Sequence, residues 1–395
     1  MGVFVTGLGV VSALGIGVEA NLSGLKSQQT GIKTNTLLEY ISKETFVGEL
    51  AKSNSELKKI VGISDAISVP RTALLGILAA TEALGKTRLN EKFKTGLISG
   101  TTVGGMDLSE NYFKEVYLDN NQENFAVTAT HDLGTVTNFI AQSCGAPGYV
   151  NTISTACSSS ANSIMLGARM IEAGLLDRVL VGGTDALSKF TISGFRSLMI
   201  YSDELCQPFD DNRKGLNLGE GAGFILLENE KSLVASKNKI LANLVGWSNA
   251  NDAYHQTGTS PEGDGAMKAM KGALESADLK ASQIDYVNAH GTATDTNDNS
   301  ESNALKRIFE NGVKFSSTKG YTGHTLGASG GIEAVYSILA MNENSIFPNI
   351  NWKTPMSGFS KLPVLELAEN QKVSHVMSNS FGFGGNSTSL IFSKS

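Results

Sequence analysis

The stretch at residues 149–171 constrains the fold most, because it places one cysteine where strand-like sequence becomes helix-like. Residues 149–153 have the composition of a strand, and the apolar residues that follow recur at helical spacing until Gly174, a helix stop. Cys157 is therefore predicted at the start of the helix, where unpaired N–H groups and the helix dipole favour a thiolate. An isolated cysteine is more often buried and structural, so a catalytic role needs other reactive residues in support.

The length and composition limit the class of protein. A chain of 395 residues exceeds the usual size of a single core, so we expect two domains or one duplicated domain. Its 32 basic and 38 acidic residues leave a net charge of −6 with no basic run, which argues against nucleic acid as a partner. With 41% hydrophobic residues, the composition is typical of a packed enzyme and not of a disordered chain.

The cysteines and the start of the chain predict a cytoplasmic location. Cys144, Cys157 and Cys206 have neither paired nor metal-ligand spacing, and an odd number argues against a disulfide framework. Residues 1–7 lack a charged segment before their apolar run, so we predict a first strand there and not a signal peptide. No segment has the roughly 18 uninterrupted apolar residues of a membrane span, so we expect no membrane association.

Strands and helices are predicted to alternate along the chain. Strand-like sequence occurs at residues 3–10, 95–101, 149–153, 177–182, 240–247 and 284–289. Helix-like sequence occurs at residues 18–25, 71–85, 131–143, 265–276 and 330–341. Residues 105–122 are polar and aromatic without a period, and we predict no regular element there. Short strands alternating with helices indicate an α/β fold with buried sheets.

The chain also repeats itself. A glycine-rich turn that leads into a strand at residues 219–227 recurs at residues 379–392. Each half otherwise runs strand, helix, strand, reactive turn and long helix, which predicts an internal duplication. We place the nucleophile in an N-terminal half, residues 1–235, and both candidate catalytic histidines in a C-terminal half, residues 236–395.

Two of the five histidines occupy turns that suit chemistry. His290 follows a strand that has buried character, and His324 lies in a glycine-rich turn ahead of a helix. The remaining histidines, at positions 131, 255 and 375, lack such a setting and are interpreted as structural. The presence of His290 and His324 in such turns makes Cys157 a candidate nucleophile.

Four motifs in this order resemble the β-ketoacyl-acyl-carrier-protein synthases of the thiolase superfamily. They are Thr155-Ala-Cys157, Asn288-Ala-His290-Gly-Thr-Ala-Thr294, residues 319–330 and residues 379–385. The Cys-His-His set is similar to that of the elongating branch. The resemblance implies a thiolase-like duplicated fold with five layers, α/β/α/β/α, usually a homodimer. It also implies an acyl-carrier protein as partner, with substrates carried on its phosphopantetheine, and neither a bound cofactor nor a metal.

The resemblance further implies decarboxylative Claisen condensation. Cys157 would hold the growing acyl chain, and His290 and His324 would donate hydrogen bonds to the thioester oxygen of malonyl-carrier protein. The backbone N–H groups of Cys157 and Phe383 would form a second oxyanion hole. Lys319 and Glu333 match a supporting pair that orients the second histidine region, although from sequence alone both are also compatible with surface charges.

The remaining matched positions concern substrate binding and structure. Thr292 and Thr294 match residues that hydrogen-bond pantetheine. Phe381 and Phe383 match a glycine-flanked aromatic loop that gates the acyl pocket, although a packed aromatic pair is the plainer alternative. The acidic residues that also match, Asp252, Asp298 and Glu301, are interpreted as structural.

Departures from the commonest elongating enzymes leave the pathway open. The chain has Ala293 and Asp295 within the His290 motif, Gly320-Tyr321 where Ser-Met is usual, and Asn386-Ser387 where Thr-Asn is usual. The function is therefore expected in fatty-acid synthesis or in polyketide or polyene synthesis. The alternative is a ketosynthase partner or chain-length subunit in a heterodimer of an aryl-polyene or pigment pathway.

Three other classes of protein fit less well. A cysteine hydrolase needs one histidine oriented by Asn or Asp, whereas here two histidines are candidates for that one role. A degradative thiolase uses a second cysteine late in the chain, and none follows Cys206. A non-catalytic chain-length subunit normally lacks the nucleophile, so Cys157 argues against it. The sequence leaves open homodimer against heterodimer, chain length and a structural monovalent cation.

Overall fold

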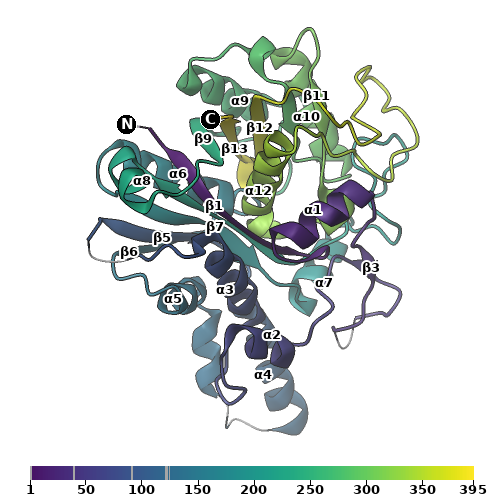
Figure 1. Cartoon of the computed structure of the whole chain (residues 1–395). Helices are drawn as coiled ribbons and strands as arrows, with labels where there is room; N and C mark the ends of the chain where they lie inside the picture. The colour runs from purple at the N-terminus through teal and green to yellow at the C-terminus, as the bar shows by residue number, and fades with distance from the viewer. Residues whose placement is uncertain (1, 39–40, 90–91, 121–122, 124) are drawn as a thin grey trace.

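The computed structural model describes residues 2–38, 41–89, 92–120, 123 and 125–395. Two runs of strands form its sheet (Figure 1). The first run contains β1 (Phe4–Ser12), β5 (Thr95–Gly100), β6 (Tyr149–Ile153), β7 (Arg178–Asp185) and β8 (Gly221–Glu228). The second contains β9 (Ala242–Asn251), β10 (Tyr286–Asn288), β11 (Lys314–Ser316), β12 (His375–Phe381) and β13 (Asn386–Ser393). β1 and β9 pair briefly and join the two runs.

Six helices cover or separate these runs in the described part of the chain. α3 (Arg71–Leu84) and α5 (Leu133–Ser143) pack on the outer face of the first run. α9 (Asp264–Ala277) and α10 (Asp295–Ile308) cover the outer side of the second run, in the upper part of Figure 1. α6 (Ser159–Glu172) and α12 (Ser329–Asn342) lie between the runs, because each contacts strands of both. The α/β fold with five layers, α/β/α/β/α, is therefore confirmed.

The strand order repeats between the halves. The first run is ordered β6-β5-β7-β8-β1 and the second β11-β10-β12-β13-β9, with α6 and α12 at equivalent places. This repeated order supports the proposal that the chain divides into halves 1–235 and 236–395. The proposed boundary falls at the end of α8 (Glu230–Ser236), just ahead of β9.

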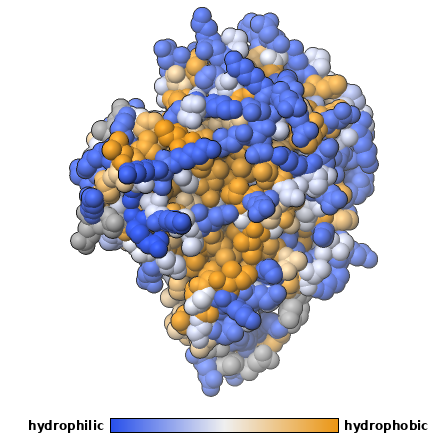
Figure 2. All heavy atoms as spheres, viewed as in Figure 1, coloured by the Kyte–Doolittle hydropathy of each residue, from blue (hydrophilic) through white to orange (hydrophobic). Residues whose placement is uncertain are grey.

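Burial explains why the central elements form. All residues of β7 are buried, as its Val-Leu-Val run predicts for a strand covered on both faces. α12 is buried along nearly its whole length, which fits a helix between two sheets. One apolar cluster draws buried residues from both halves, including Ile164, Ile225 and Ile332. In Figure 2 apolar side chains likewise gather across the middle of the face shown, where Figure 1 draws β1, β7 and α3.

The prediction of no regular structure at residues 105–122 is wrong. α4 (Met106–Asp119) is a helix that ends at Asn120 in the left-handed conformation. Its contacts come mainly from η1 (Phe125–His131), the next element along the chain, and also from α7 (Lys189–Ser197), so the helix is stabilised by neighbours that its own periodicity does not show. α10 was also not predicted, because its buried face is built largely of polar side chains.

The remaining elements have ten residues or fewer. They are β2 (Gly15–Ile16), α1 (Val18–Ser27), β3 (Lys33–Thr34), β4 (Phe46–Val47), α2 (Asn54–Val61), η2 (Ala281–Gln283), α11 (Lys319–Thr322), η3 (Leu326–Ala328) and η4 (Phe383–Gly385). Within the residues that the structure describes, no helix is both long and apolar enough to cross a membrane.

Candidate active site

Cys157 stands in the sharp turn between β6 and α6. The residue before it, Ala156, has a left-handed φ of 52°, which reverses the chain over a few residues. The Ser159 hydroxyl lies 2.9 Å from the Thr155 amide nitrogen and 2.6 Å from the Ala156 carbonyl oxygen, and so closes the turn. Cys157 precedes the first helical residue by two positions and is buried, with 6% of its surface exposed. The predicted strand, reactive turn and helix are confirmed.

The resting thiol is protonated at neutral pH. Burial raises the pKa of Cys157 to about 12. The Lys319 ammonium and the N–H groups of Phe383 and of Cys157 itself lower that pKa, but by less. The prediction that the helix start favours a thiolate is therefore wrong for this site, because desolvation outweighs the donors that face the sulfur.

Both candidate histidines meet the cysteine. Nε2 of His324 lies 3.1 Å from Sγ of Cys157, and Nδ1 lies 3.0 Å from the Ser329 hydroxyl. The His290 ring meets the His324 ring edge to face, with centroids 5.3 Å apart. Burial, joined by the nearby Lys319 charge, lowers the pKa of both histidines well below the usual value. Two neutral imidazoles therefore share one buried pocket with the thiol.

Lys319 and Glu333 form a buried ion pair beside His290, and not beside His324 as the resemblance suggested. Nζ of Lys319 donates to the His290 carbonyl at 2.6 Å and lies 3.2 Å from Nδ1 of that ring. An ammonium group only donates, so Nδ1 accepts and the ring proton sits on Nε2. Burial raises the pKa of Glu333 to about 7 against the opposing charge of Lys319. The pair therefore holds His290 as a neutral Nε2–H donor.

Two acidic side chains hold the backbone that follows β10. Glu301 accepts the N–H groups of His290 at 2.9 Å and Gly291 at 2.8 Å, and Asp298 accepts that of Thr292 at 2.9 Å. Burial raises the pKa of Glu301 to about 7. Neither carboxylate contacts the thiol or the imidazole rings, which agrees with a structural interpretation.

The glycine loop at residues 382–385 covers the nucleophile from the C-terminal half. The Phe383 ring stacks on Phe195 with centroids 5.7 Å apart, and the Phe381 ring centroid lies 5.8 Å from that of His290. A Cβ added to Gly382 would lie only 3.0 Å from the Thr155 carbonyl oxygen, so the loop passes the nucleophile turn closely. Gly384 and Gly385 have φ values of 80° and 78°, which favour glycine.

A cavity of about 410 Å³ opens above these groups. One side is apolar and comes from a segment that sequence reasoning did not identify, namely Phe195, Leu198, Ile200 and Leu216. The rest of the lining includes Thr292 and Thr294, whose hydroxyl oxygens lie 2.9 Å apart. Nothing in the polar, turn-rich sequence around residues 198–216 distinguishes a pocket wall. The cavity brings together both predicted threonines, both phenylalanines, both histidines and Cys157.

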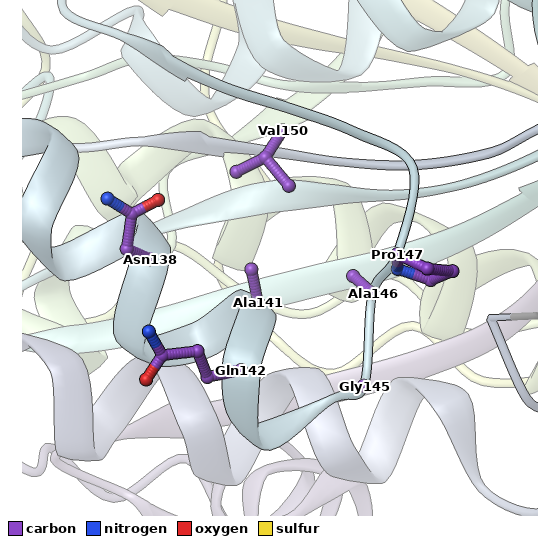
Figure 3. A pocket seen from close by; sticks show the side chains of 7 residues that line it. All are labelled: Asn138, Ala141, Gln142, Gly145, Ala146, Pro147 and Val150. Carbon is purple, nitrogen blue, oxygen red and sulfur yellow. The ribbon is translucent and has the colours of Figure 1, made fainter.

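A second hollow of about 330 Å³ lies at the edge of the sheet (Figure 3). It is lined by seven residues from the end of α5, the following turn and β6: Asn138, Ala141, Gln142, Gly145, Ala146, Pro147 and Val150. None of these side chains is titratable or nucleophilic, so the chemistry belongs to the first cavity.

The Cys157, His290 and His324 side chains have the composition of a zinc site, and their candidate ligand atoms lie within 4.8 Å of one another. Metal binding at His290 Nε2 would require removal of the proton that the Lys319 contact holds there, so the arrangement suits hydrogen-bond donation better. Asn288 and Ser378, neighbours across β10 and β12, have buried side-chain oxygens without a partner in the described residues. Such oxygens suit a water or a monovalent cation, the question that the sequence left open.

Comparison with known families covers both halves of the chain. The family model described as "Beta-ketoacyl synthase, N-terminal domain" matches residues 2–232, and that described as "Beta-ketoacyl synthase, C-terminal domain" matches residues 241–353. A 3-oxoacyl-[acyl-carrier-protein] synthase 2 from Staphylococcus aureus is 32% identical over 410 aligned residues, which cover 99% of this chain and 98% of that protein. One from Synechocystis is 31% identical over 416 residues with the same coverage.

Solved structures agree over the whole chain. The ishigamide ketosynthase/chain length factor has a TM-score of 0.93 at 26% identity, covering 100% of this chain and 99% of that chain. A ketosynthase in complex with its chain length factor from Xenorhabdus doucetiae has a TM-score of 0.84 at 30% identity, covering 100% and 98%.

Proposed function

Because this chain belongs to the β-ketoacyl synthase family, we propose that it is a 3-oxoacyl-[acyl-carrier-protein] synthase that condenses malonyl-carrier protein with an acyl chain held on Cys157. The observation that carries the proposal is the contact of 3.1 Å between His324 Nε2 and the thiol, with His290 edge to face beside it. This pairing supplies one nucleophile and two neutral donors in one cavity.

The first half-reaction is acyl transfer to Cys157. The sulfur attacks the thioester carbonyl of the acyl-carrier protein, and the thiol proton passes to His324 Nε2. The carbonyl oxygen gains negative charge next to the N–H groups of Cys157 and Phe383, which already face the sulfur. One such donor typically contributes about 2.7–4 kcal/mol to a transition state. The carbon–sulfur bond to pantetheine then breaks, and the departing thiolate takes the proton from His324.

The second half-reaction is decarboxylation and condensation. Nε2–H of His290 donates to the malonyl thioester oxygen. His324 joins it in the tautomer that carries the ring proton on Nε2, in which Nδ1 accepts from the Ser329 hydroxyl. As the bond to the carboxylate breaks, carbon dioxide leaves and its electron pair forms the enolate. The enolate carbon attacks the acyl carbonyl on Cys157, and the Cys157 thiolate leaves and takes up a proton from solvent. Lys319 and Glu333 act through His290, whose proton they keep on Nε2.

The cavity divides into a polar and an apolar part that suit the two ends of the substrate. Thr292 and Thr294 offer hydroxyl groups to the pantetheine arm. The apolar wall of Phe195, Leu198, Ile200 and Leu216 suits the acyl chain, and Phe383 stacks on that wall as a gate. On this proposal the enzyme needs no free cofactor or metal, because the substrates bring their own activated thioesters.

The partners are an acyl-carrier protein and a second subunit in the cytoplasm. β6 ends the sheet and pairs with β5 alone among the described strands, and Tyr149 at its start is 37% exposed. Such an edge suits pairing with a second copy. The likeness to two ketosynthase structures that include a chain length factor favours a related subunit as the second candidate partner, and a polyene or pigment pathway with it. Cys157 makes this chain the catalytic subunit in either assembly.

The test is the intact mass of the protein after incubation with acyl-carrier proteins that differ in chain length and unsaturation. We expect a mass increase of one acyl group that peptide mapping places on Cys157, followed by loss of that group when malonyl-carrier protein is added. An adduct on Cys144 or Cys206 with Cys157 free would overturn the assignment. The preferred acyl chain separates fatty-acid synthesis from a polyene pathway.

A further inference from the structure

Asn386 joins the end of the glycine loop to the turn that holds the nucleophile. Its side-chain oxygen accepts hydrogen bonds from the Ser158 hydroxyl at 2.6 Å, from the Asn162 amide at 3.0 Å and from the Asn249 amide at 2.8 Å. Ser158 directly follows the nucleophile, and Asn162 lies in the first turn of α6. One oxygen of the C-terminal half therefore contacts two residues of the nucleophile turn in the N-terminal half.

The nucleophile turn has internal bonds that do not depend on Asn386. The Ser158 hydroxyl also lies 2.7 Å from the Thr155 carbonyl oxygen, so its single hydrogen has a second acceptor. The Asn162 amide also donates to the Thr155 hydroxyl at 2.8 Å. Loss of the Asn386 oxygen would therefore leave these donors with partners, and the turn with its shape.

The loop itself is held to the C-terminal half by hydrogen bonds to its own main-chain groups. The Gly384 N–H donates to the Gln256 carbonyl at 2.8 Å, and the Asn251 amide donates to the Gly384 carbonyl at 2.8 Å. The Gly382 N–H donates to the Asn386 carbonyl at 2.8 Å. These contacts set the shape of the loop, whereas the Asn386 side chain sets its distance from the nucleophile turn.

That distance matters because Phe383 lies three residues before Asn386, in a loop that passes Cys157 closely: a Cβ added to Gly382 would lie only 3.1 Å from the Cys157 nitrogen, and the Phe383 N–H is among the groups that lower the pKa of the thiol. An oxyanion donor is effective only within a few tenths of an ångström of its position, and a misplacement of 1 Å can cost about 100-fold in rate.

We propose that Asn386 is a positioning residue that fixes the Phe383 N–H over the acyl carbonyl by tying the glycine loop to Ser158 and Asn162. The inference rests on the proposed function and makes it more specific. The Phe383 donor serves the acyl carbonyl in transfer and in condensation, whereas His290 and His324 serve malonyl decarboxylation. Loss of the tie therefore slows acyl transfer and leaves decarboxylation nearly unchanged.

The experiment measures both half-reactions separately in the full chain. Asn386→Leu removes the acceptor at similar volume, and Asn386→Asp keeps an acceptor oxygen. Asn249→Ala removes one donor, whose amide also lies 3.1 Å from the Asn162 oxygen, but leaves the bonds of Asn386 to Ser158 and Asn162 in place. We expect Asn386→Leu to lower kcat for acyl transfer by roughly 10- to 100-fold with KM and the melting temperature little changed. Asn386→Asp should recover most of that loss, and Asn249→Ala should remain near the unmodified rate.

Equal acyl-transfer rates in the unmodified protein and Asn386→Leu would overturn the proposal, as would a parallel loss of decarboxylation. A loss in Asn386→Leu that Asn386→Asp does not recover would also overturn it. Where Asn386→Leu fails to fold, the comparison of Asn386→Thr with Asn386→Asp takes its place, with the same expected order. Failure of the unmodified protein to acylate Cys157 would contradict the proposed function itself, and so differs from each of these results.

Discussion

The two halves use equivalent connections for different chemistry. In the N-terminal half the link from β6 to α6 is short and strained at Ala156, and it presents Cys157. In the C-terminal half the link from β11 to α12 is longer, includes α11 and η3, and carries both Lys319 and His324. A short turn holds a nucleophile in one orientation. The longer connection has room for a donor, His324, and for a cation, Lys319, that contacts His290.

The edge strands of the halves differ as well. β6 is exposed or half-buried along its length, whereas Phe315 and Ser316 of β11 are buried. The Val364 N–H donates to the Phe315 carbonyl at 2.9 Å, so the chain covers the β11 edge with its own later segment. The same topology thus leaves one edge open and closes the other.

The largest expected effect follows from removing the nucleophile of the N-terminal half alone. Cys157→Ala should abolish self-acylation, while malonyl decarboxylation persists because His290 and His324 remain in the C-terminal half. Mass spectrometry of the protein and release of labelled carbon dioxide measure the two activities. If decarboxylation disappeared together with acylation, the division of labour between the halves would be contradicted.

The matching change in the C-terminal half removes one donor. His290→Ala should lower malonyl decarboxylation by about 100- to 1,000-fold, the usual cost of losing an oxyanion donor. Acyl transfer should fall far less, because His324 and not His290 contacts Sγ of Cys157, while the His290 ring contacts Lys319. A larger loss in acyl transfer than in decarboxylation would show that the roles are reversed.

The pH dependence of acyl transfer tests the contact between His324 and Cys157, which joins the two halves. Burial raises the pKa of Cys157 to about 12, so at neutral pH the free thiolate fraction is small and grows about tenfold per pH unit. With His324 present, the proton leaves during attack, and the rate should be nearly flat from pH 6.5 to about 8.5. In His324→Ala the rate should be lower and rise about tenfold per unit. The rates are measured across this range at constant ionic strength. Equal slopes of rate against pH for the two proteins would contradict transfer of the thiol proton to His324.

A smaller effect is expected from the gate between the halves. Phe383→Ala keeps the backbone N–H but loses a half-buried ring whose stacking on Phe195 is worth about 0.5–1.5 kcal/mol. We expect a melting temperature only slightly lower and a changed profile of accepted chain lengths. Thermal melting paired with acylation rates distinguishes this from a core position, for which the stability loss would be about 3–5 kcal/mol with an unchanged profile.

The smallest effect concerns the open edge. The double variant Tyr149→Glu, Asn151→Glu places like charges on β6, which oppose each other if two copies pair along this strand. We expect the mass measured by light scattering to fall twofold, from that of two subunits to that of one. Lys314→Glu, on the covered edge, serves as the matched control and should leave the mass unchanged. An unchanged mass for the β6 variant would place the subunit contact elsewhere.

Much of the fold was predictable because its elements have local signals. The strand at residues 149–153 matches β6, and the predicted helices at residues 71–85, 265–276 and 330–341 correspond to α3, α9 and α12. The sequence does not predict α4 and α10, because both are polar, without an apolar stripe, and are stabilised by contacts with neighbouring elements. The reactive residues were also found, since cysteine and histidine in glycine-rich turns carry a chemical signal of their own.

The sequence by itself determined the alternation of elements, their repetition in two halves, and the set of Cys157, His290 and His324. Only the tertiary structure decided that the thiol is protonated, that Lys319 supports His290 and not His324, and that Asn386 reaches the nucleophile turn. Periodicity and turn chemistry depend on neighbours along the chain, so they are present in the sequence. Desolvation and the geometry of hydrogen bonds depend on which distant segments pack together. The tie from Asn386 to Ser158 joins segments of opposite halves, and the contact of Lys319 with His290 joins two segments of the C-terminal half.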